Sequence, residues 1–363
     1  MEGQRVLMQL PTLRRERTPL FILRRSRPLT LLVAAILIGL TAACGSTGGS
    51  GEAKTIRVGL SSKSPTMLPL YVALDKGYFS AAGVKVAEPV VLPSGAKLAA
   101  AVVGGSIDVG IGVTPDVFNL AGTGKPVKII GETYPSYYVD IVKGKGIKAP
   151  DNADLKTKIK ALAGKKIGIT GPGSGTEALL TYLFRQAGLD PAKDAEVVSL
   201  GSDPSAAITA LKSGQVDAVS HILSVGQQAE AEGIGQIYIS PGHGDVPALK
   251  GTLHGVAYAL QPTIDAKRPD TKAFLKAMQR GLDFIHEHPE DAVRILQKRF
   301  SGMSPKVLST VGATVVANVP KTLAIDPHGY EVEADMLKQA GILQKEAPPL
   351  DKLAVSDLTP KAP

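Results

Sequence analysis

The chain has 363 residues, of which 44% are apolar, with one cysteine and no tryptophan. This length suits two domains or one large interrupted domain, and the apolar fraction argues against a disordered chain. A single cysteine excludes an intrachain disulfide framework and a thiolate zinc site. The formal net charge of +8 indicates nucleic acid or an anionic membrane as partner only if the basic residues lie in the folded part.

The first 44 residues differ from the rest of the chain. Seven arginines precede an uncharged run over residues 29–40, which is too short for a bilayer span of roughly 20 residues but fits a signal peptide. The run ends in Leu40-Thr-Ala-Ala-Cys44, which resembles a bacterial lipobox with Thr41 in place of the usual leucine. We therefore expect a signal peptide over 1–43 and diacylation of Cys44; a buried cysteine in an N-terminal helix is the alternative.

Removal of this leader changes the charge of the protein. Without its seven basic and two acidic residues the chain carries 34 basic and 31 acidic residues, a net charge of +3. Nucleic acid is therefore not an expected partner. Residues 44–53 comprise the lipidated cysteine and a Gly/Ser-rich flexible tether, which predicts a protein anchored in the periplasm or at the outer face of the cell membrane.

The body of the chain contains a duplicated strand–helix series. Gly59 and Asp108 recur 109 residues later as Gly168 and Asp217, and the Val90–Val91 pair recurs after 107 residues. Strands that alternate with helices at this spacing indicate parallel α/β sheets. The sequence thus predicts an α/β fold of two lobes, each a mostly parallel sheet flanked by helices.

Two extended segments, around 134–135 and over 251–260, are candidate crossovers between the lobes. They divide the chain into lobe 1 (54–138 and 252–345), lobe 2 (139–251) and a C-terminal tail (346–363). A chain that crosses twice leaves a cleft between the lobes, which is the expected ligand site.

The turn Gly171-Pro-Gly-Ser-Gly-Thr176 follows one predicted strand and precedes a predicted helix. Its glycines let backbone N–H groups approach a ligand, Ser174 and Thr176 add hydroxyls, and a helix N-terminus favours negative charge. An anion site that includes Ser174, Gly175 and Thr176 is predicted, with a plain capping turn as the alternative. The turn matches neither a dinucleotide fingerprint nor a P-loop nor an esterase elbow.

Equivalent places in the duplicated pattern supply further candidates. Ser62 and Lys63 lie in the corresponding turn of lobe 1, where they either grip the ligand or form a solvated loop. Thr114 and His221 follow strands at the end where open sheets bind ligands. For His221 the alternative is a structural histidine whose hydrogen bonds are satisfied.

Three tyrosines near the first crossover, Tyr134, Tyr137 and Tyr138, either stack on an aromatic ligand or pack as part of a hinge. The six histidines are scattered, apart from His286 and His288, whose spacing puts them on different faces of a helix. No metal site and no cofactor are therefore expected.

A series of motifs resembles the nitrate/sulfonate/taurine-type (NMT1-like) substrate-binding proteins of ABC importers. The motifs occur in order at 57–60, 69–79, 83–86, 105–110, 112–115, 164–169, 173–174 and 214–218. The resemblance implies a type II periplasmic-binding-protein fold, a monomer, and delivery of a ligand to a permease. Carried over by position, it places Ser62, Thr114, the 174–176 turn and the region of His221 in the cleft.

These expectations describe a lipid-anchored receptor, not an enzyme, for a small anion such as a sulfonate, taurine, nitrate or a related organic acid. Binding or synthesis of a thiamine-pyrimidine-like heteroaromatic precursor is the alternative, because relatives of this fold take part in thiamine-pyrimidine synthesis. An enzyme would need a metal cluster or a reactive nucleophile, and the sequence suggests neither.

Overall fold

The computed structural model describes residues 55–148, 152–343, 346–355 and 357–358. The predicted signal peptide, Cys44 and the whole of the predicted tether lie outside these residues. Among the described helices, none is long and apolar enough to cross a membrane.

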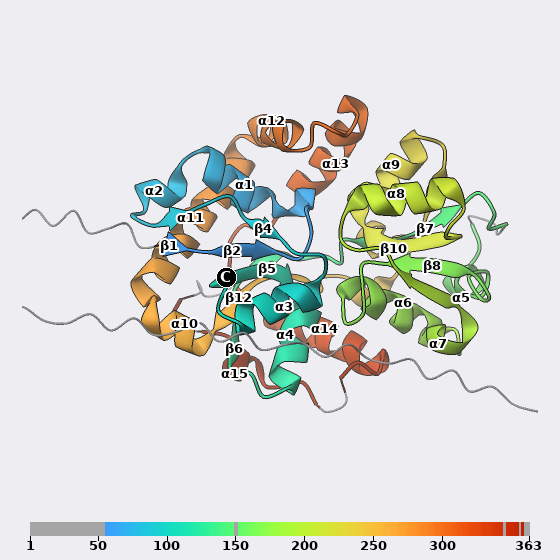
Figure 1. Ribbon diagram of the computed structural model, residues 1–363, viewed down its shortest axis with the longest axis horizontal. Helices are drawn as coiled ribbons and strands as arrows, with labels where there is room; N and C mark the ends of the chain where they lie inside the picture. Colours follow the sequence, from blue (N-terminus) through green and yellow to red (C-terminus); the bar gives the residue numbers. More distant parts are fainter. Residues whose placement is uncertain (1–54, 149–151, 344–345, 356, 359–363) are drawn as a thin grey trace, which may run out of the picture. The chain divides into compact units, whose positions relative to one another are not determined.

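Two five-stranded sheets form the body of the protein (Figure 1). The first sheet has the order β4-β2-β5-β12-β6. Its strands, in chain order, are β2 (Val58–Leu60), β4 (Val90–Val91), β5 (Val109–Val113), β6 (Val127–Tyr134) and β12 (Gly255–Leu260). Strand β2 pairs in parallel with β4 and β5, whereas β12 runs antiparallel between β5 and β6. Four of the five strands therefore point the same way.

The second sheet repeats this plan in the order β11-β7-β10-β8-β9. Its strands are β7 (Val139–Gly144), β8 (Lys166–Ile169), β9 (Glu196–Ser199), β10 (Ala218–Ile222) and β11 (Gly235–Ile239). Strand β8 pairs in parallel with β9 and β10, and β7 runs antiparallel between β10 and β11. A small separate pair joins β1 (Thr55–Ile56) to β3 (Lys85–Val86) in parallel.

The duplication predicted from the sequence is confirmed strand by strand. Gly59 and Gly168 occupy β2 and β8, each pairing with the strands on either side of it, and the two Val-Val pairs lie in β4 and β9. The chain passes from the first sheet to the second between β6 and β7, and returns between β11 and β12. The one antiparallel strand of each sheet is the strand that directly follows a crossover.

Helices flank both sheets (Figure 1). Those of residues 55–148 are α1 (Leu68–Asp75), α2 (Tyr78–Ala81), α3 (Gly95–Val103) and α4 (Thr114–Gly122). Those between the two crossovers are α5 (Leu155–Lys160), α6 (Gly175–Gln186), α7 (Pro191–Asp194), α8 (Pro204–Ser213) and α9 (Leu223–Ala231). The remaining helices are α10 (Gln261–Ala266), α11 (Arg268–Glu287), α12 (Pro289–Arg299), α13 (Pro305–Asn318), α14 (Pro327–Gln339) and α15 (Leu350–Leu353).

The predicted tail packs on the first sheet. Ala354, directly after α15, forms a parallel bridge with Ile129 of β6, and Leu353 is buried. Helix α14 lies against α6, a helix of the segment between the two crossovers. The C-terminal part of the chain thus contacts a strand of the first sheet and a helix that flanks the second sheet.

Candidate functional site

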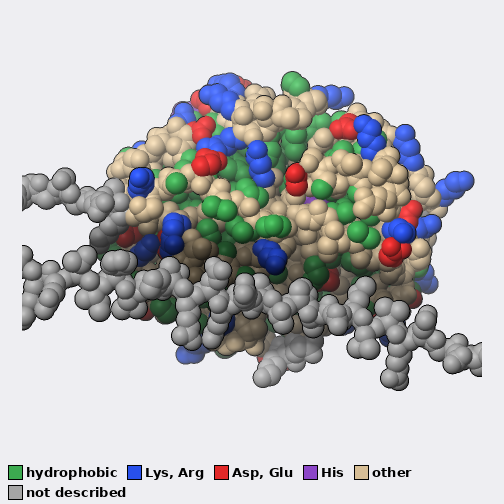
Figure 2. Space-filling view, in the orientation of Figure 1, with side chains coloured by type: hydrophobic (Ala, Val, Ile, Leu, Met, Phe, Trp, Pro, Cys, Tyr) green, Lys and Arg blue, Asp and Glu red, His purple; other side chains and the backbone are tan. Residues whose placement is uncertain are grey.

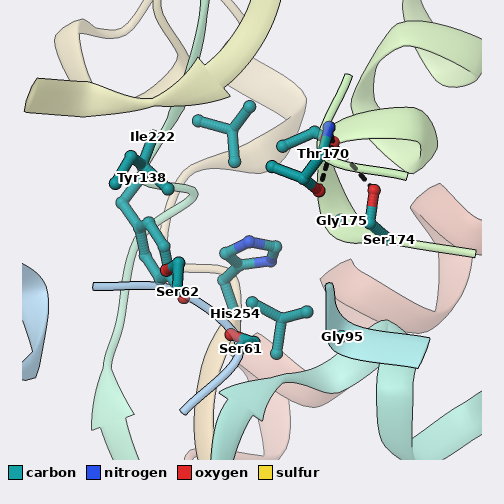
Figure 3. Close-up of a pocket in the computed structure, with 12 residues that line it drawn as sticks. Ser61, Ser62, Gly95, Tyr138, Thr170, Ser174, Gly175, Ile222 and His254 are labelled. Carbon is teal, nitrogen blue, oxygen red and sulfur yellow. Dashed lines mark hydrogen bonds between the residues drawn. The ribbon is translucent and has the colours of Figure 1, made fainter. Parts of the chain in front are cut away.

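A cavity of about 30 Å³ lies where the strands of both sheets end (Figure 3). The first sheet contributes the turn after β2, the end of β5 and the start of α3, and the second contributes the loop after β8, the start of α6 and the end of β10. Both crossovers add side chains. The lining residues are Ser61, Ser62, Gly95, Val113, Tyr138, Val139, Thr170, Ser174, Gly175, Thr176, Ile222 and His254. Ligands of open α/β sheets bind at such carboxyl ends of strands.

The first turn of α6 forms one wall of this cavity. Ser174 is the N-cap residue, and its Oγ accepts a hydrogen bond from the backbone N of Glu177 at 3.3 Å. Gly173 precedes it with φ +73°, a backbone conformation that glycine adopts without strain. The first turn of a helix leaves backbone N–H groups without partners inside the helix, so this wall offers donors and a partial positive charge.

A chain of hydroxyl groups supports the same turn. The Thr176 Oγ1 lies 2.7 Å from Ser174 Oγ and 3.0 Å from Thr170 Oγ1, and it accepts a hydrogen bond from the backbone N of Thr170 at 3.0 Å. The Ser220 hydroxyl donates to the carbonyl oxygen of Thr176 at 2.7 Å. These contacts connect α6 to β8 and β10 and hold the turn in one conformation.

The start of α3 faces the cavity from the first sheet. Ser94 caps this helix, and a Cβ on Gly95 would overlap the carboxyl group of Asp116, so only glycine fits there. Asp116 is buried and accepts a hydrogen bond from the backbone N of Val113 at 3.2 Å. Burial raises the pKa of Asp116 to about 7, against the opposing effect of that hydrogen bond. A carboxyl group therefore lies behind the cavity wall without a cationic partner among the described residues.

His254 is fully buried and lines the cavity from the second crossover. Its Nδ1 lies 3.2 Å from Oε1 of Glu333 on α14, and the other oxygen of Glu333 accepts a hydrogen bond from the Thr252 hydroxyl. Its Nε2 has no hydrogen-bond partner among the described residues. In Figure 3 the ring projects between Ser61 and Ser62 on one side and the start of α6 on the other.

Two of the crossover tyrosines pack on this histidine. The Tyr137 ring stacks on His254 with centroids 3.6 Å apart, and its hydroxyl donates to the carbonyl oxygen of Gly175 at 2.7 Å. Tyr138 meets the His254 ring edge to face at 5.0 Å, and Tyr134 meets Tyr138 in the same way at 5.5 Å. His254 therefore covers one face of Tyr137, whose side chain is buried, as the hinge-packing alternative requires.

Four of the eight ligand candidates from the sequence line the cavity, namely Ser62, Ser174, Gly175 and Thr176. Lys63 does not: its Nζ lies 5.5 Å from the centroid of the Phe300 ring, where a cation–π contact holds it. Tyr134 does not line it either, and instead borders a second cavity of about 20 Å³.

Thr114 and His221 are also absent from the lining, and the polar atoms of both side chains form hydrogen bonds with backbone groups. The Thr114 hydroxyl donates to the carbonyl oxygen of Leu253, and its backbone N donates to that of His254 at 2.9 Å. In His221 the Nδ1 accepts from the backbone N of Ile222 at 3.0 Å, and Nε2 lies 3.3 Å from the carbonyl oxygen of Gly201. Both ring nitrogens of His221 are thus used, which is the structural alternative stated for it.

The main residue missed by sequence reasoning is His254. It stands in the predicted crossover over 251–260, as one polar side chain ahead of an apolar strand. That pattern signals a buried histidine, but its neighbour Glu333 is 79 residues away and nothing in the sequence connects the two. Thr170, which directly follows β8, is a further lining residue that sequence reasoning missed, whereas Ser61 belongs to the predicted turn of Ser62 and Lys63.

The cavity lining contains no lysine or arginine. On the face shown in Figure 2, Lys and Arg side chains are scattered and do not form one patch. Within the described ranges, no group of three or more His, Cys, Asp or Glu side chains could hold a metal ion. Any preference for anions in this cavity must therefore come from helix N-termini, hydroxyl groups and His254.

The fold is that of the periplasmic binding proteins. A protein of Bordetella bronchiseptica RB50 superimposes with TM-score 0.72 at 24% identity, over 84% of this chain and 95% of the other. The alkanesulfonate-binding protein SsuA from Xanthomonas axonopodis pv. citri, bound to MOPS, gives 0.66 at 18% over 83% and 98%. The periplasmic nitrate-binding protein NrtA from Synechocystis PCC 6803 gives 0.63 at 18% over 85% and 87%. These similarities confirm the two-lobed fold predicted from the sequence.

The sequence itself identifies the family. The model described as "NMT1/THI5 like" matches residues 64–292, which is more than half of the chain, so the protein belongs to the NMT1/THI5-like family. A search of the curated proteins found no match to the chain. The resemblance on which the sequence analysis relied is thereby confirmed at the level of the family.

Proposed function

We propose that this protein is the extracytoplasmic solute-binding component of an ABC importer and that it captures a small anion for delivery to a permease. The observation that carries the proposal is the convergence of the α6 N-terminus and its hydroxyl groups with His254 on one cavity between the sheets. Anions bind favourably at helix N-termini, where N–H groups and the helix dipole act together. The binding proteins for alkanesulfonate and nitrate that share the fold support the same class of ligand.

The charge of the site narrows the ligand further. Since no lysine or arginine lines the cavity and Asp116 lies behind its wall, two full negative charges would meet too little compensation. The proposal therefore favours ligands with one singly charged anionic group, such as alkanesulfonates, taurine, nitrate or monocarboxylic acids. Ligand contacts to both sheets would stabilise a closed arrangement of the lobes over an open one.

The organisation of the chain completes the proposal. Residues 1–43 act as a signal peptide, Cys44 is diacylated, and residues 44–53 tether a monomeric body close to the permease. Lobe 1 spans 54–138 and 252–345, lobe 2 spans 139–251, and 346–363 form the tail. Radiolabelled palmitate should enter the wild-type protein in a bacterial host and be absent from a Cys44→Ser variant; labelling of both forms would contradict lipidation at this residue.

Calorimetric titration of the purified protein without residues 1–43 tests the ligand class. Methanesulfonate, taurine, nitrate and benzoate are added in a buffer free of sulfonates, and at least one should bind with a dissociation constant in the micromolar range or below. Gly122→Ala serves as a folded control, because a Cβ at Gly122 meets nothing within 4 Å. If no anion binds while a neutral solute does, the proposal is wrong.

The alternative function, binding or synthesis of a heteroaromatic precursor, would use the second cavity. Tyr134, Tyr137 and Tyr138 border it together with Asp140 and Gln227. In this arrangement Tyr137 stacks on His254, so that face of its ring is not open to a pyrimidine. Binding of an aminopyrimidine in the same titrations, or its turnover detected by mass spectrometry, would establish this alternative.

A further inference from the structure

One nitrogen in the cavity is buried and has no partner. His254 has an exposed fraction of 0%, and its Nε2 makes no hydrogen bond to any described residue. A Cβ built on Gly175 would lie 3.3 Å from this nitrogen, so Nε2 is directed at the first residue of α6. A buried polar group without a hydrogen bond costs free energy, which a ligand that supplies the partner would recover.

The other ring nitrogen determines which ligands Nε2 can accept. The two oxygens of Glu333 face Nδ1 of His254 and the hydroxyl of Thr252, and a carboxylate accepts from both. With Glu333 as a carboxylate, Nδ1 carries the proton of the neutral ring and Nε2 presents a lone pair. An anion would meet that lone pair with repulsion, and only the doubly protonated ring offers it an N–H donor.

The charged groups near the His254 ring explain why a second proton on that ring would matter for anion binding. Glu333 faces it from α14, Asp116 lies behind the wall on α4, and Glu177 occupies the first turn of α6. The phenol rings of Tyr137 and Tyr138 also pack against the imidazole. Because no lysine or arginine lines the cavity, a proton on His254 is the one full positive charge that the lining itself can acquire.

We propose that His254, held by Glu333, takes up a proton when an anion binds and donates it from Nε2 in a hydrogen bond to the ligand. The inference rests on the proposed function and adds the group that recognises the anion. Glu333 keeps its negative charge and stabilises the imidazolium through Nδ1, so the histidine–glutamate pair becomes a neutral ion pair and the α6 N-terminus meets the remaining charge of the ligand. The protein would thus bind an anion together with a proton.

The test uses methanesulfonate and nitrate, neither of which changes its own protonation between pH 6 and pH 9. Titration of the body lacking residues 1–43 in weakly buffered solution, followed with a pH electrode, should show uptake of up to one proton per anion bound. Calorimetry in buffers of different ionisation enthalpy, none of them a sulfonate, gives the same number independently. The affinity should fall as pH rises, by at most about tenfold per pH unit.

Substitutions test whether the proton that is taken up on anion binding resides on His254. His254→Gln keeps an amide donor but cannot titrate, so it should bind anions with no proton uptake and no dependence on pH in this range. His286→Gln is the matched control, since that ring is exposed and contacts only the carbonyl oxygen of Pro320, and it should retain full uptake. Glu333→Gln should weaken anion binding and reduce uptake, because the imidazolium loses its carboxylate partner.

The outcomes separate this inference from the proposed function. Anion binding without proton uptake in the wild-type protein overturns the role of His254 and leaves the anion receptor intact. Uptake that persists in His254→Gln also overturns it. If neither methanesulfonate nor nitrate, nor any other anion, binds the wild-type protein, the proposed function and this inference fail together. The wild-type measurement decides the matter even if His254→Gln does not fold.

Discussion

Asp108 and Asp217, 109 residues apart, make the same hydrogen bond in the two sheets. Oδ2 of Asp108 accepts from the backbone N of Arg57 at 2.8 Å, and Oδ2 of Asp217 accepts from the backbone N of Lys166 at 2.8 Å. Each aspartate ends the loop before β5 or β10 and ties it to the start of the neighbouring parallel strand. A recurring Gly-x-x-Asp pattern thus has one structural cause in both halves of the protein.

The two aspartates should differ in their contribution to stability. Asp108 is buried and also pairs with the side chains of Arg57 and Lys267, at 2.7 Å and 2.8 Å, whereas Asp217 is half-buried. Asp108→Asn should therefore lower the free energy of unfolding by about 2–3 kcal/mol and Asp217→Asn by about 1 kcal/mol, since charged hydrogen bonds contribute more when buried. Urea unfolding at pH 7 measures both, and equal losses would contradict the argument.

Asp108 should also contribute to acid sensitivity. Burial opposes its charged form, but hydrogen bonds from Arg57 and Lys267 outweigh burial and lower the pKa of Asp108 to about 2. A carboxyl whose pKa is depressed on folding stabilises the protein above its unfolded pKa near 4, and that stability disappears between pH 4 and pH 2. The contribution is about 2 kcal/mol. Asp108→Asn should unfold with a correspondingly flatter dependence on pH in this window.

His221 should make the protein less stable at mildly acidic pH. Burial lowers the pKa of His221 to about 4, against the raising effects of the Gly201 carbonyl and Asp203. The unfolded chain therefore binds the proton more tightly than the folded one, so stability is complete above pH 6.5 and falls as pH decreases towards 4. The loss is on the order of 3 kcal/mol. His221→Gln should reduce the pH dependence of the urea-unfolding midpoint between pH 7 and pH 4. Substitution of the exposed His286 by Gln, as a control, should leave that dependence unchanged.

A methyl group at Gly175 should obstruct the site with little effect on folding. The added Cβ would lie 3.0 Å from Cε1 of His254, which is closer than ordinary contact. Alanine is otherwise acceptable in the first turn of a helix. Gly175→Ala should reduce anion affinity at least tenfold, while its free energy of unfolding stays within about 1 kcal/mol of the wild-type value. Gly122→Ala, where a Cβ meets nothing, should bind normally; unchanged affinity in Gly175→Ala would place the ligand elsewhere.

Loss of the Thr176 hydroxyl should cost more stability than loss of the Ser174 hydroxyl. Thr176→Val leaves the buried backbone N of Thr170 without its acceptor, which costs about 1–3 kcal/mol. Ser174→Ala removes a helix cap, which costs about 1 kcal/mol. Urea unfolding ranks the two, and calorimetry should show weaker anion binding in both, because both hydroxyls line the cavity.

A hydrogen bond between a loop of the first sheet and a loop of the second should influence affinity from outside the site. The Ser202 hydroxyl, in the loop after β9, donates to the carbonyl oxygen of Leu92, in the loop after β4, at 2.7 Å. If ligand binding favours the arrangement in which these loops touch, Ser202→Ala should weaken anion binding by about 2- to 10-fold. Ser106→Ala removes an exposed hydroxyl that bonds only within its own turn and should leave affinity unchanged.

Four of the twelve residues that line the cavity were ligand candidates from the sequence, and the physical reason is locality. Ser174, Gly175 and Thr176 act through a strand–turn–helix unit that short-range patterns reveal, and Ser62 follows from the duplication of that unit. Thr114 and His221 occupy equivalent places at strand ends, but their polar atoms are taken by backbone partners such as Leu253, 139 residues away from Thr114. Position in a repeat predicts where a residue lies and not which partner its side chain finds.

The sequence by itself determined the family, through its motifs, and the two duplicated lobes, through alternating strands and helices and recurring Gly and Asp residues. Tertiary structure alone decided what the site contains. In the folded protein Glu333 of α14 contacts His254, 79 residues away in sequence. Lys63 packs over the ring of Phe300, and Tyr137 stacks on His254. Such contacts depend on how elements distant in sequence pack, which local periodicity does not encode.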